Sequence, residues 1–122
     1  MNIGYIYKIT NTINNKCYIG QTSKTIEKRW REHVAMSIRT DRPDYKYPLY
    51  RALRKYKSEN FVVEKIEECN IEKLNEREIY WIEFYDSYKN GYNQDMGGGG
   101  RLIYIIVCMK LEEPFLILVY QM

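Results

Sequence analysis

The chain has 122 residues, of which 45% are hydrophobic and 29% are charged. This length and balance suffice for one compact domain with its own core, and they exclude a mainly disordered chain. The formal charge of +3 conceals an asymmetry, because residues 1–60 hold 13 lysines and arginines against 5 acidic residues, whereas residues 61–122 hold 6 against 11. A basic N-terminal half is typical of proteins that bind nucleic acid, although a solvated surface is the commoner origin of such charge.

The three cysteines, Cys17, Cys69 and Cys108, are odd in number and widely spaced, so they predict neither a disulfide framework nor a C-x-x-C motif. This usage favours a reducing, intracellular location, and the first residues show no signal-peptide pattern. Charged residues and Pro114 interrupt the most apolar segment, residues 102–120. A membrane helix needs roughly 20 mostly uncharged residues, so we expect no membrane span.

The first elements in chain order form a predicted β-hairpin. Residues 3–10 alternate with the period of a strand, and residues 16–20 form a second β-prone run after a turn-rich segment. A helix follows, because apolar side chains recur at every fourth position from Ile26 to Ile38, behind Ser23 or Thr25 as a possible N-cap. Arg29 and His33 are also four residues apart, so they lie together on a face beside that apolar stripe.

Three further elements are predicted after residue 47. Pro48 can open a second helix, which carries Leu49, Ala52, Leu53 and Tyr56. Residues 61–67 predict a third strand, although Lys65 disturbs the alternation. Residues 70–86 follow a helical pattern of apolar positions.

Glu78 lies near the centre of the apolar stripe of this last helix. Burial of an unpaired carboxylate is costly, so Glu78 should be paired, protonated or bound to a cation. A position at the edge of the stripe, or a salt bridge to the first helix, is the purely structural explanation.

The sequence divides into a domain and a tail. Gly97–Gly100 is expected to act as a flexible linker between a domain at residues 1–96 and an apolar tail at residues 101–122. The tail has no assigned role: a β-hairpin on the domain, a dimer contact and an atypical end are all open. We expect residues 1–100 to suffice for a folded, active protein, and the sequence does not indicate an oligomeric state.

Five ordered motifs resemble those of the GIY-YIG endonuclease family, especially its phage-type and intron-homing members. They are Tyr5-Ile6-Tyr7 with Gly4 before it, Tyr18-Ile19-Gly20, the run Glu27-Lys28-Arg29-Trp30-Arg31-Glu32-His33, Glu78 within residues 75–82, and Asn90-Gly91-Tyr92-Asn93. The resemblance covers residues 3 to about 98.

The resemblance implies an α+β fold, with a small three-stranded antiparallel sheet flanked by helices. It also implies hydrolysis of DNA phosphodiester bonds with one divalent ion, Mg²⁺ or Mn²⁺. The implied catalytic residues are Tyr7 and Tyr18 in one cleft, Arg29 at the scissile phosphate, His33 beside the tyrosines, Glu78 as the metal ligand and Asn93 as a positioning residue.

The chemistry of these residue types supports the implied roles. A guanidinium offers a fixed fork of donors to phosphate, and Mg²⁺ accepts a single carboxylate together with substrate and water, which suits Arg29 and Glu78. Tyr7 is a plausible general base if the charges of a nearby arginine and metal ion favour its phenolate, and His33 is either the competing base or the acceptor of the Tyr7 proton. The structural alternatives are a cross-strand tyrosine pair, a half-buried histidine bonded to backbone, and a turn asparagine at Asn93.

The expected partner is DNA, bound through the basic residues of the first two helices. The predicted contacts are Lys24, Lys28, Arg31, Arg51, Arg54 and Lys55. The alternative from another functional class is a noncatalytic nucleic-acid-binding module on the same scaffold. Metal-dependent nicking of plasmid DNA would separate the two.

Overall fold

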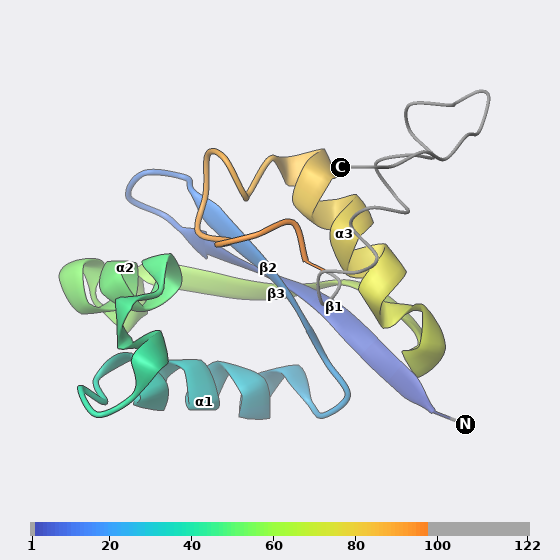
Figure 1. Ribbon diagram of the computed structural model, residues 1–122, viewed down its shortest axis with the longest axis horizontal. Coiled ribbons are helices and arrows are strands. Elements are labelled where there is room, and N and C mark those ends of the chain that lie inside the picture. The colour runs from blue at the N-terminus through green and yellow to red at the C-terminus, as the bar shows by residue number, and fades with distance from the viewer. Residues whose placement is uncertain (1, 98–122) are drawn as a thin grey trace.

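The computed structural model describes residues 2–97, and the expected tail at residues 101–122 lies outside them. Within residues 2–97 the chain forms a three-stranded antiparallel sheet flanked by three α-helices (Figure 1), so the predicted α+β class is confirmed. The strands are β1 (Ile3–Asn11), β2 (Cys17–Thr22) and β3 (Phe61–Asn70), and the helices are α1 (Ile26–Ser37), α2 (Pro48–Tyr56) and α3 (Leu74–Tyr85). Short 3₁₀ turns occupy Pro43–Lys46, Ser58–Asn60 and Ile71–Lys73.

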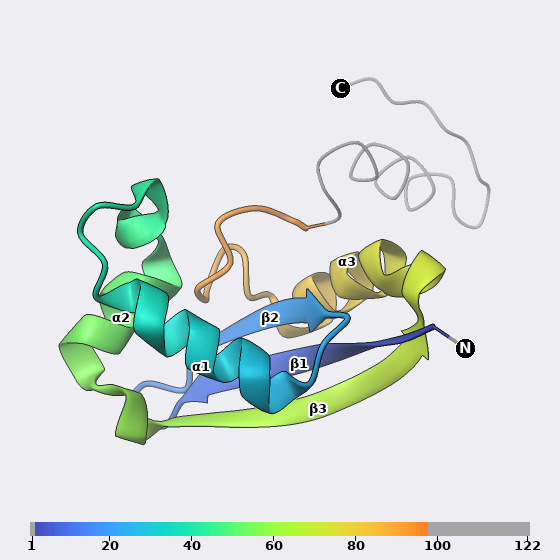
Figure 2. The same cartoon turned by 90° about the horizontal axis from the view of Figure 1, so that it is seen from below.

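The central strand β1 supplies core residues to both faces of the sheet, whose strand order is β2-β1-β3. Ile6 and Tyr7 are consecutive, and both are almost fully buried. Since successive side chains of a strand point to opposite faces, they enter two different clusters. Tyr7 packs in the cluster that includes α2, with α1 against it, and Ile6 packs with residues of α3. The helices therefore lie around the sheet as two groups (Figure 2).

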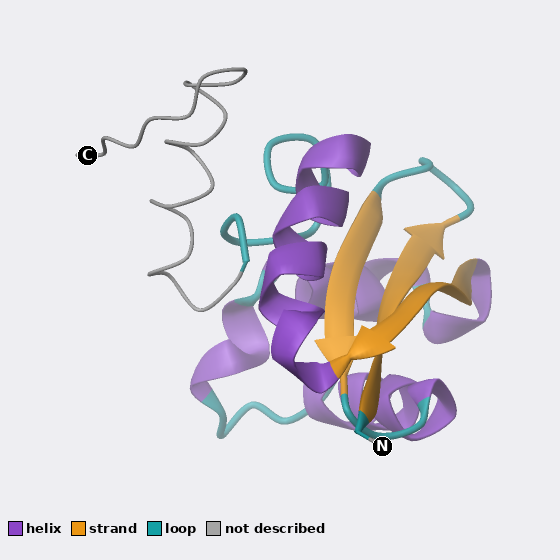
Figure 3. Cartoon of the chain, turned by 90° about the vertical axis from the view of Figure 1, so that its right-hand side faces the viewer, coloured by secondary structure: helices purple, strands orange, loops and turns teal. Residues whose placement is uncertain are grey.

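A β-bulge in the pairing of β1 with β3 lies beside Tyr7. Ile6 is opposite Glu67 and Tyr7 is opposite Lys65, so β3 carries one extra residue, Ile66, at this point. The bulge explains why the alternation of β3 is disturbed around Lys65. Beyond it β3 continues to Asn70, three residues past the predicted end at Glu67, and the sheet is visibly twisted (Figure 3).

Helix α1 turns a partly polar face toward the core. Its N-cap is Thr25, whose side-chain oxygen accepts a hydrogen bond from the backbone N–H of Lys28 at 3.1 Å. The buried residues of α1 are His33 and Ser37, whereas Ile38 is 71% exposed and lies past the end of the helix. The predicted apolar stripe is therefore wrong at its last position, because hydrogen bonds described below place His33 in the core.

Helices α2 and α3 follow the predicted patterns closely. α2 begins at Pro48, and Leu49, Ala52 and Leu53 are buried as expected. α3 begins four residues after the predicted start, because Ile71–Lys73 forms a 3₁₀ turn. It ends at Tyr85, where Asp86 adopts a left-handed conformation with φ of 53°.

Three further observations concern the cysteines, the helices and the expected linker within residues 2–97. Cys17 and Cys69 are free thiols. None of the helices in this part of the chain is long and apolar enough to cross a membrane. Gly97, the first residue of the expected linker, is buried beside Ile82 of α3 with φ of 86°.

Candidate active site

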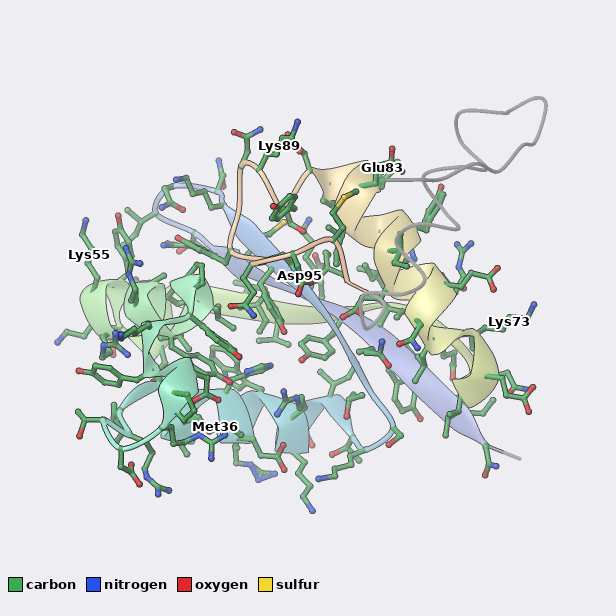
Figure 4. All side chains as sticks on the ribbon, viewed as in Figure 1. Met36, Lys55, Lys73, Glu83, Lys89 and Asp95 are labelled. Atoms are coloured by element: carbon green, nitrogen blue, oxygen red, sulfur yellow. The ribbon has the colours of Figure 1, made fainter. Side chains whose placement is uncertain are left out.

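The site lies along the edge of β2 that faces away from β1. The segment after α3 runs beside this strand (Figure 1), and the backbone N–H of Tyr92 donates to the carbonyl of Cys17 at 2.8 Å. A cleft of about 320 Å³ opens there between α1 and this segment. Figure 4 labels Met36 on α1 and Asp95 on the segment, and both residues line the cleft. Other lining residues are Tyr18, Arg29, His33, Tyr50, Glu78 and Asn93.

Tyr7 and His33 form the buried centre of the site. Tyr7 Oη lies 2.7 Å from His33 Nε2, and the two residues are 1% and 2% exposed. Burial raises the pKa of Tyr7 well above its ordinary value, and the positive charge of Arg29 only partly opposes this. In the metal-free protein, burial therefore outweighs the charge of Arg29, and Tyr7 keeps its proton.

His33 uses both ring nitrogens. Nδ1 lies 2.8 Å from the hydroxyl of Tyr50 in α2, so the alternative of a histidine bonded to backbone is wrong. Burial, together with the charge of Arg29, lowers the pKa of His33 to about 3. His33 is therefore a neutral imidazole at pH 7.

Tyr18 completes an aromatic cluster around this imidazole. In the register of β1 and β2, Tyr7 is opposite Gly20 and Tyr18 is opposite Ile9, so the two tyrosines are diagonal neighbours on one face. Their ring centroids are 6.3 Å apart, and the ring of Tyr18 meets that of His33 edge-on at 5.5 Å. The tyrosines thus form the predicted cross-strand contact. Tyr18 lines the cleft, and Tyr7 lies beneath it, bonded to the lining residue His33. Burial raises the pKa of Tyr18 well above its ordinary value.

Arg29 is held at the cleft by its own helix. Its Nη1 donates to Glu32 Oε1 at 3.1 Å, and the two side chains are 28% and 29% exposed. Burial disfavours the charged form of Arg29, but Tyr7 and the hydrogen bond with Glu32 outweigh this and raise its pKa. Arg29 is therefore a permanent, partly accessible cation beside the Tyr7 hydroxyl.

Glu78 reaches the same cleft from the other side of the sheet. It is one turn from Leu74 and one turn from Ile82, both buried in the α3 interface, and is itself only partly buried. Glu78 Oε1 accepts a hydrogen bond from Nε2 of Gln21 at 3.0 Å, and Gln21 also donates to Asn75 Oδ1 at 2.7 Å. The carboxylate is therefore oriented on the packed face of α3, which agrees with its position in the predicted stripe.

Asn93 binds the edge of β2 with its side chain. Its Oδ1 accepts from the backbone N–H of Ile19 at 2.8 Å, and its Nδ2 donates to the carbonyl of Ile19 at 2.9 Å. Ser87 Oγ donates to the same Oδ1 at 2.6 Å. Asn93 thus replaces a neighbouring strand beside Tyr18, which is a positioning role rather than that of a simple turn residue.

The donor set around Glu78 fits a hard cation. Mg²⁺ and Mn²⁺ bind oxygen ligands and often take only one or two carboxylates from the protein. Glu78 and Asp95 both line the cleft, whereas residues 2–97 contain no cluster of three or more His, Cys, Asp or Glu side chains placed to hold a metal. The arrangement suits an ion whose other ligands are substrate and water, and it does not suit a closed structural zinc site.

The predicted DNA-binding residues do not share one environment. Lys28, Arg31, Arg51 and Lys55 are exposed. Lys24 is exposed but forms a 3.4 Å ion pair with Glu32. Arg54 is held by two contacts, a hydrogen bond from Nη1 to the carbonyl of Ser37 at 2.7 Å and a stack on the Tyr45 ring at 3.7 Å.

Three residues in or beside the cleft were not identified from the sequence. Tyr50 gave no signal beyond its place in a helix, although it contacts His33 directly. Gln21 follows the second motif and holds Glu78. Asp95 lies two residues after Asn93 and lines the cleft. The apolar pattern of a helix or strand says nothing about such polar neighbours, because they meet only in the folded chain.

Comparisons with known proteins find similar sequences in viruses. The chain is 39% identical over 90 residues to "Intron-associated endonuclease 1" of Enterobacteria phage T4, a match that covers 72% of this chain and 35% of that protein. It is 36% identical over 97 residues to "Uncharacterized protein 019R" of Invertebrate iridescent virus 6, which covers 77% of this chain and 34% of that protein. The matched region is thus about a third of the length of either relative.

A solved structure shares the fold. The catalytic domain of homing endonuclease I-TevI superposes with a TM-score of 0.62 at 32% identity, which covers 75% of this chain and 98% of that domain. Residues 3–93 match the family described as "GIY-YIG catalytic domain". These residues include every predicted catalytic position from Tyr7 to Asn93. The chain therefore belongs to the GIY-YIG family.

Proposed function

We propose that this domain is an endonuclease that hydrolyses phosphodiester bonds of DNA. The observation that carries the proposal is the convergence of His33, Arg29 and Glu78 on one cleft, with Tyr7 buried directly behind His33. Attack of water on a phosphodiester develops negative charge on the phosphate oxygens and on the leaving oxygen, so positive groups at the site lower the barrier.

Arg29 is the proposed ligand of the scissile phosphate. In the free protein its guanidinium is paired with Glu32, and it lies beside the buried Tyr7 hydroxyl. A phosphate offers stronger, bidentate hydrogen bonds than one carboxylate oxygen. Transfer of Arg29 from Glu32 to the phosphate would bring the reacting group to Tyr7 and open the Tyr7 oxygen to the attacking water.

Tyr7 is the proposed acceptor of the proton of that water. Both nitrogens of His33 are already engaged with phenols, whereas the Tyr7 oxygen has a further lone pair. As Tyr7 takes the proton of water, it passes its own proton to His33. Bound phosphate would also offset the charge of Arg29, which is one of the two causes of the low pKa of His33.

Glu78 is the proposed ligand of a single Mg²⁺ or Mn²⁺ ion, with Gln21 orienting its carboxylate. When bound, such an ion stabilises negative charge on phosphate and leaving oxygens. The side chain of Asn93 keeps β2, and with it Tyr18, in place beside this carboxylate.

DNA is expected to approach the cleft across the exposed basic side chains of α1 and α2. Contacts with phosphate position a duplex without reading its sequence. Lys28, Arg31, Arg51 and Lys55 are available for such contacts. Lys24 and Arg54 remain predicted contacts, but Arg54 also joins α2 to the end of α1.

A noncatalytic DNA-binding module would explain the basic surface but not the buried polar groups. Binding of phosphates requires neither a neutral histidine between two buried phenols nor a carboxylate on the packed face of α3. Hydrogen bonds only offset the cost of burying such groups, and apolar side chains of similar volume would serve a purely binding scaffold at least as well. The catalytic assignment accounts for both.

The test is cleavage of supercoiled plasmid by the full chain, with Mg²⁺, with Mn²⁺ and with EDTA. Nicking that requires a divalent ion and is lost in Tyr7→Phe supports the proposal. Tight DNA binding without nicking under any metal condition would identify the noncatalytic module instead. Nicking that persists in EDTA would exclude Glu78 as an essential metal ligand.

A further inference from the structure

A chain of hydrogen bonds continues from Tyr7 beyond His33 into the body of the protein. Tyr7 Oη lies 2.7 Å from His33 Nε2, and His33 Nδ1 lies 2.8 Å from Tyr50 Oη. The hydroxyl of Tyr50 in turn donates to Sδ of Met36 at 3.7 Å. Four side chains from β1, α1 and α2 are therefore joined end to end.

The protons in this chain have two possible arrangements. Burial raises the pKa of both Tyr7 and Tyr50, so each phenol keeps its hydrogen, and the neutral imidazole of His33 carries one N–H. In the first arrangement Tyr7 donates to His33 Nε2, His33 Nδ1–H donates to Tyr50, and Tyr50 donates to Met36. In the second, Tyr50 donates to His33 Nδ1 and His33 Nε2–H donates to Tyr7. The two arrangements differ in which nitrogen of His33 is protonated.

Met36 decides between them because a thioether accepts hydrogen bonds and donates none. If the Tyr50 hydroxyl donates to Met36, its oxygen is left to accept from Nδ1–H of His33. Nε2 is then unprotonated and accepts from Tyr7. In the reverse arrangement Met36 receives no donor, and the Tyr7 hydroxyl no longer donates to His33 while its other partner, Arg29, can only donate.

We propose that Tyr50 is a positioning residue that, with Met36 as the terminal acceptor, fixes His33 as the Nδ1–H tautomer. This commits the proton of Tyr7 to His33 Nε2 and leaves the remaining lone pair of the Tyr7 oxygen for an incoming proton. The inference rests on the proposed function for its catalytic meaning, but the tautomer is a property of the free protein.

The tautomer determines whether the proposed proton transfer is possible. A proton of the attacking water moves to Tyr7 Oη while the Tyr7 proton moves to the bare Nε2, so that His33 becomes an imidazolium with both nitrogens protonated. The new oxygen–phosphorus bond forms as the bond to the leaving oxygen breaks. That oxygen takes a proton from solvent, and the imidazolium releases one. The opposite tautomer already holds a proton on Nε2 and has no place for that of Tyr7.

His33 is the sole histidine of the chain, which makes the tautomer directly measurable. In protein labelled with ¹⁵N-histidine, long-range ¹H–¹⁵N correlation spectra distinguish a protonated from an unprotonated ring nitrogen. We expect the wild-type protein to show protonated Nδ1 and bare Nε2 at pH 7. Protonated Nε2 in the wild-type protein would overturn the proposal.

Two variants test the roles of Tyr50 and Met36. Tyr50→Phe removes the acceptor of Nδ1–H, so His33 should shift to the Nε2–H tautomer, and the single-turnover cleavage rate should fall at least about 10-fold with unchanged DNA affinity. Met36→Leu keeps the side-chain volume but frees the Tyr50 hydroxyl to donate to Nδ1, so the same tautomer shift is expected. Met36→Leu also keeps the test available if Tyr50→Phe does not fold.

Tyr56→Phe is the matched control, because Tyr56 lies on the same helix and packs against the same core cluster. It should leave both the tautomer and the cleavage rate unchanged. A wild-type tautomer in folded Tyr50→Phe, or in Met36→Leu, would show that these residues only fill the core. Absence of cleavage by the wild-type protein would instead overturn the proposed function, whatever the tautomer.

Discussion

The Cα of Gly20 in β2 lies against the hydroxyl of Tyr7 in β1, and a methyl group at Gly20 would come within 2.4 Å of Tyr7 Oη. The two residues are partners in the strand register, so the contact is fixed by the sheet. Gly20 thereby sets how far the Tyr7 hydroxyl extends toward His33 and Arg29. Gly20 of the second motif, Tyr18-Ile19-Gly20, thus helps to position Tyr7 of the first motif, Tyr5-Ile6-Tyr7.

Gly20→Ala should therefore impair catalysis by moving the Tyr7 hydroxyl. Misplacement of a reacting group by about 1 Å costs roughly 10²-fold in rate, and we expect a loss of this order in single-turnover cleavage.

Gly4→Ala is the control for added volume, since a methyl group there would lie 2.5 Å from Cδ1 of Leu74, in the cluster that packs against α3. Both substitutions should destabilise the fold by about 1–3 kcal/mol, as judged by urea denaturation. Equal cleavage rates in the two variants would contradict the role of Gly20.

Glu78→Gln should abolish metal-dependent cleavage while the fold and DNA binding remain. The amide keeps the shape of the side chain but loses the charge that a divalent cation requires. A loss of at least about 10²-fold is expected in Mg²⁺. Glu76→Gln, an exposed position on the same helix, makes the same charge change away from the cleft and should cut normally. Wild-type rates in Glu78→Gln would remove Glu78 from the metal site.

Arg29→Lys should be nearly as inactive as Arg29→Ala. A lysine keeps the charge but not the planar fork of donors that binds two phosphate oxygens, so we expect losses of about 10²-fold or more. Arg39→Ala, at an exposed arginine just beyond α1, is the control and should retain the wild-type rate. Full activity of Arg29→Lys would mean that charge alone is needed.

The salt dependence of DNA binding should identify the surface that meets DNA. We expect Arg51→Gln with Lys55→Gln to reduce the slope of log K against log salt by about 1–2, since each phosphate contact contributes about 0.9. Arg54 stays unchanged in this design because its contacts with Ser37 and Tyr45 support the fold. Lys73→Gln with Lys89→Gln removes the same charge elsewhere and should leave the slope unaltered. The same slope in both pairs would place DNA on another face.

Stability should fall as the pH is lowered below the pKa of an unfolded histidine, about 6.5. The pKa of His33 is about 3 in the folded protein, so between these values the unfolded chain binds a proton that the folded protein does not. Stability from this source is present above pH 6.5 and declines toward pH 3. The loss between pH 8 and pH 5 should be about 2 kcal/mol.

Urea denaturation at both pH values measures this loss. His33→Gln serves as the reference, because subtraction of its pH dependence removes the contribution of the carboxylates. A wild-type protein with the same pH dependence as His33→Gln would show that His33 titrates normally in the fold.

The order of the strands and helices could be predicted from sequence because local patterns determine it. Alternation in β1, the N-cap at Thr25 and the start of α2 at Pro48 all depend on neighbours within a few residues. The end of β3 was missed because the bulge at Ile66 breaks the two-residue period that marks a strand. The burial of His33 in place of Ile38 depends on Tyr7 and Tyr50, which lie 26 and 17 positions away in the chain.

The candidate site was predictable only where a motif names its residues. The cleft is lined by Tyr18, Arg29, His33, Glu78 and Asn93, and Tyr7 contacts His33 beneath it. The sequence shows the positive charge near Tyr7 but not the burial that outweighs it in the metal-free protein. Tyr50 was missed because its hydroxyl becomes significant only beside a histidine from another helix.

The hydrogen bonds between the Asn93 side chain and the backbone of Ile19 join residues 74 positions apart in the sequence. The hairpin and α1 can form from the first third of the domain, but the edge of β2 has no partner there until residue 93 has been synthesised and has docked. The cleft is therefore completed by almost the last residue of the domain to leave the ribosome. A nascent or truncated chain that ends before Asn93 contains Tyr7, Arg29 and His33 but lacks the side chain that pairs with the backbone of Ile19 beside Tyr18.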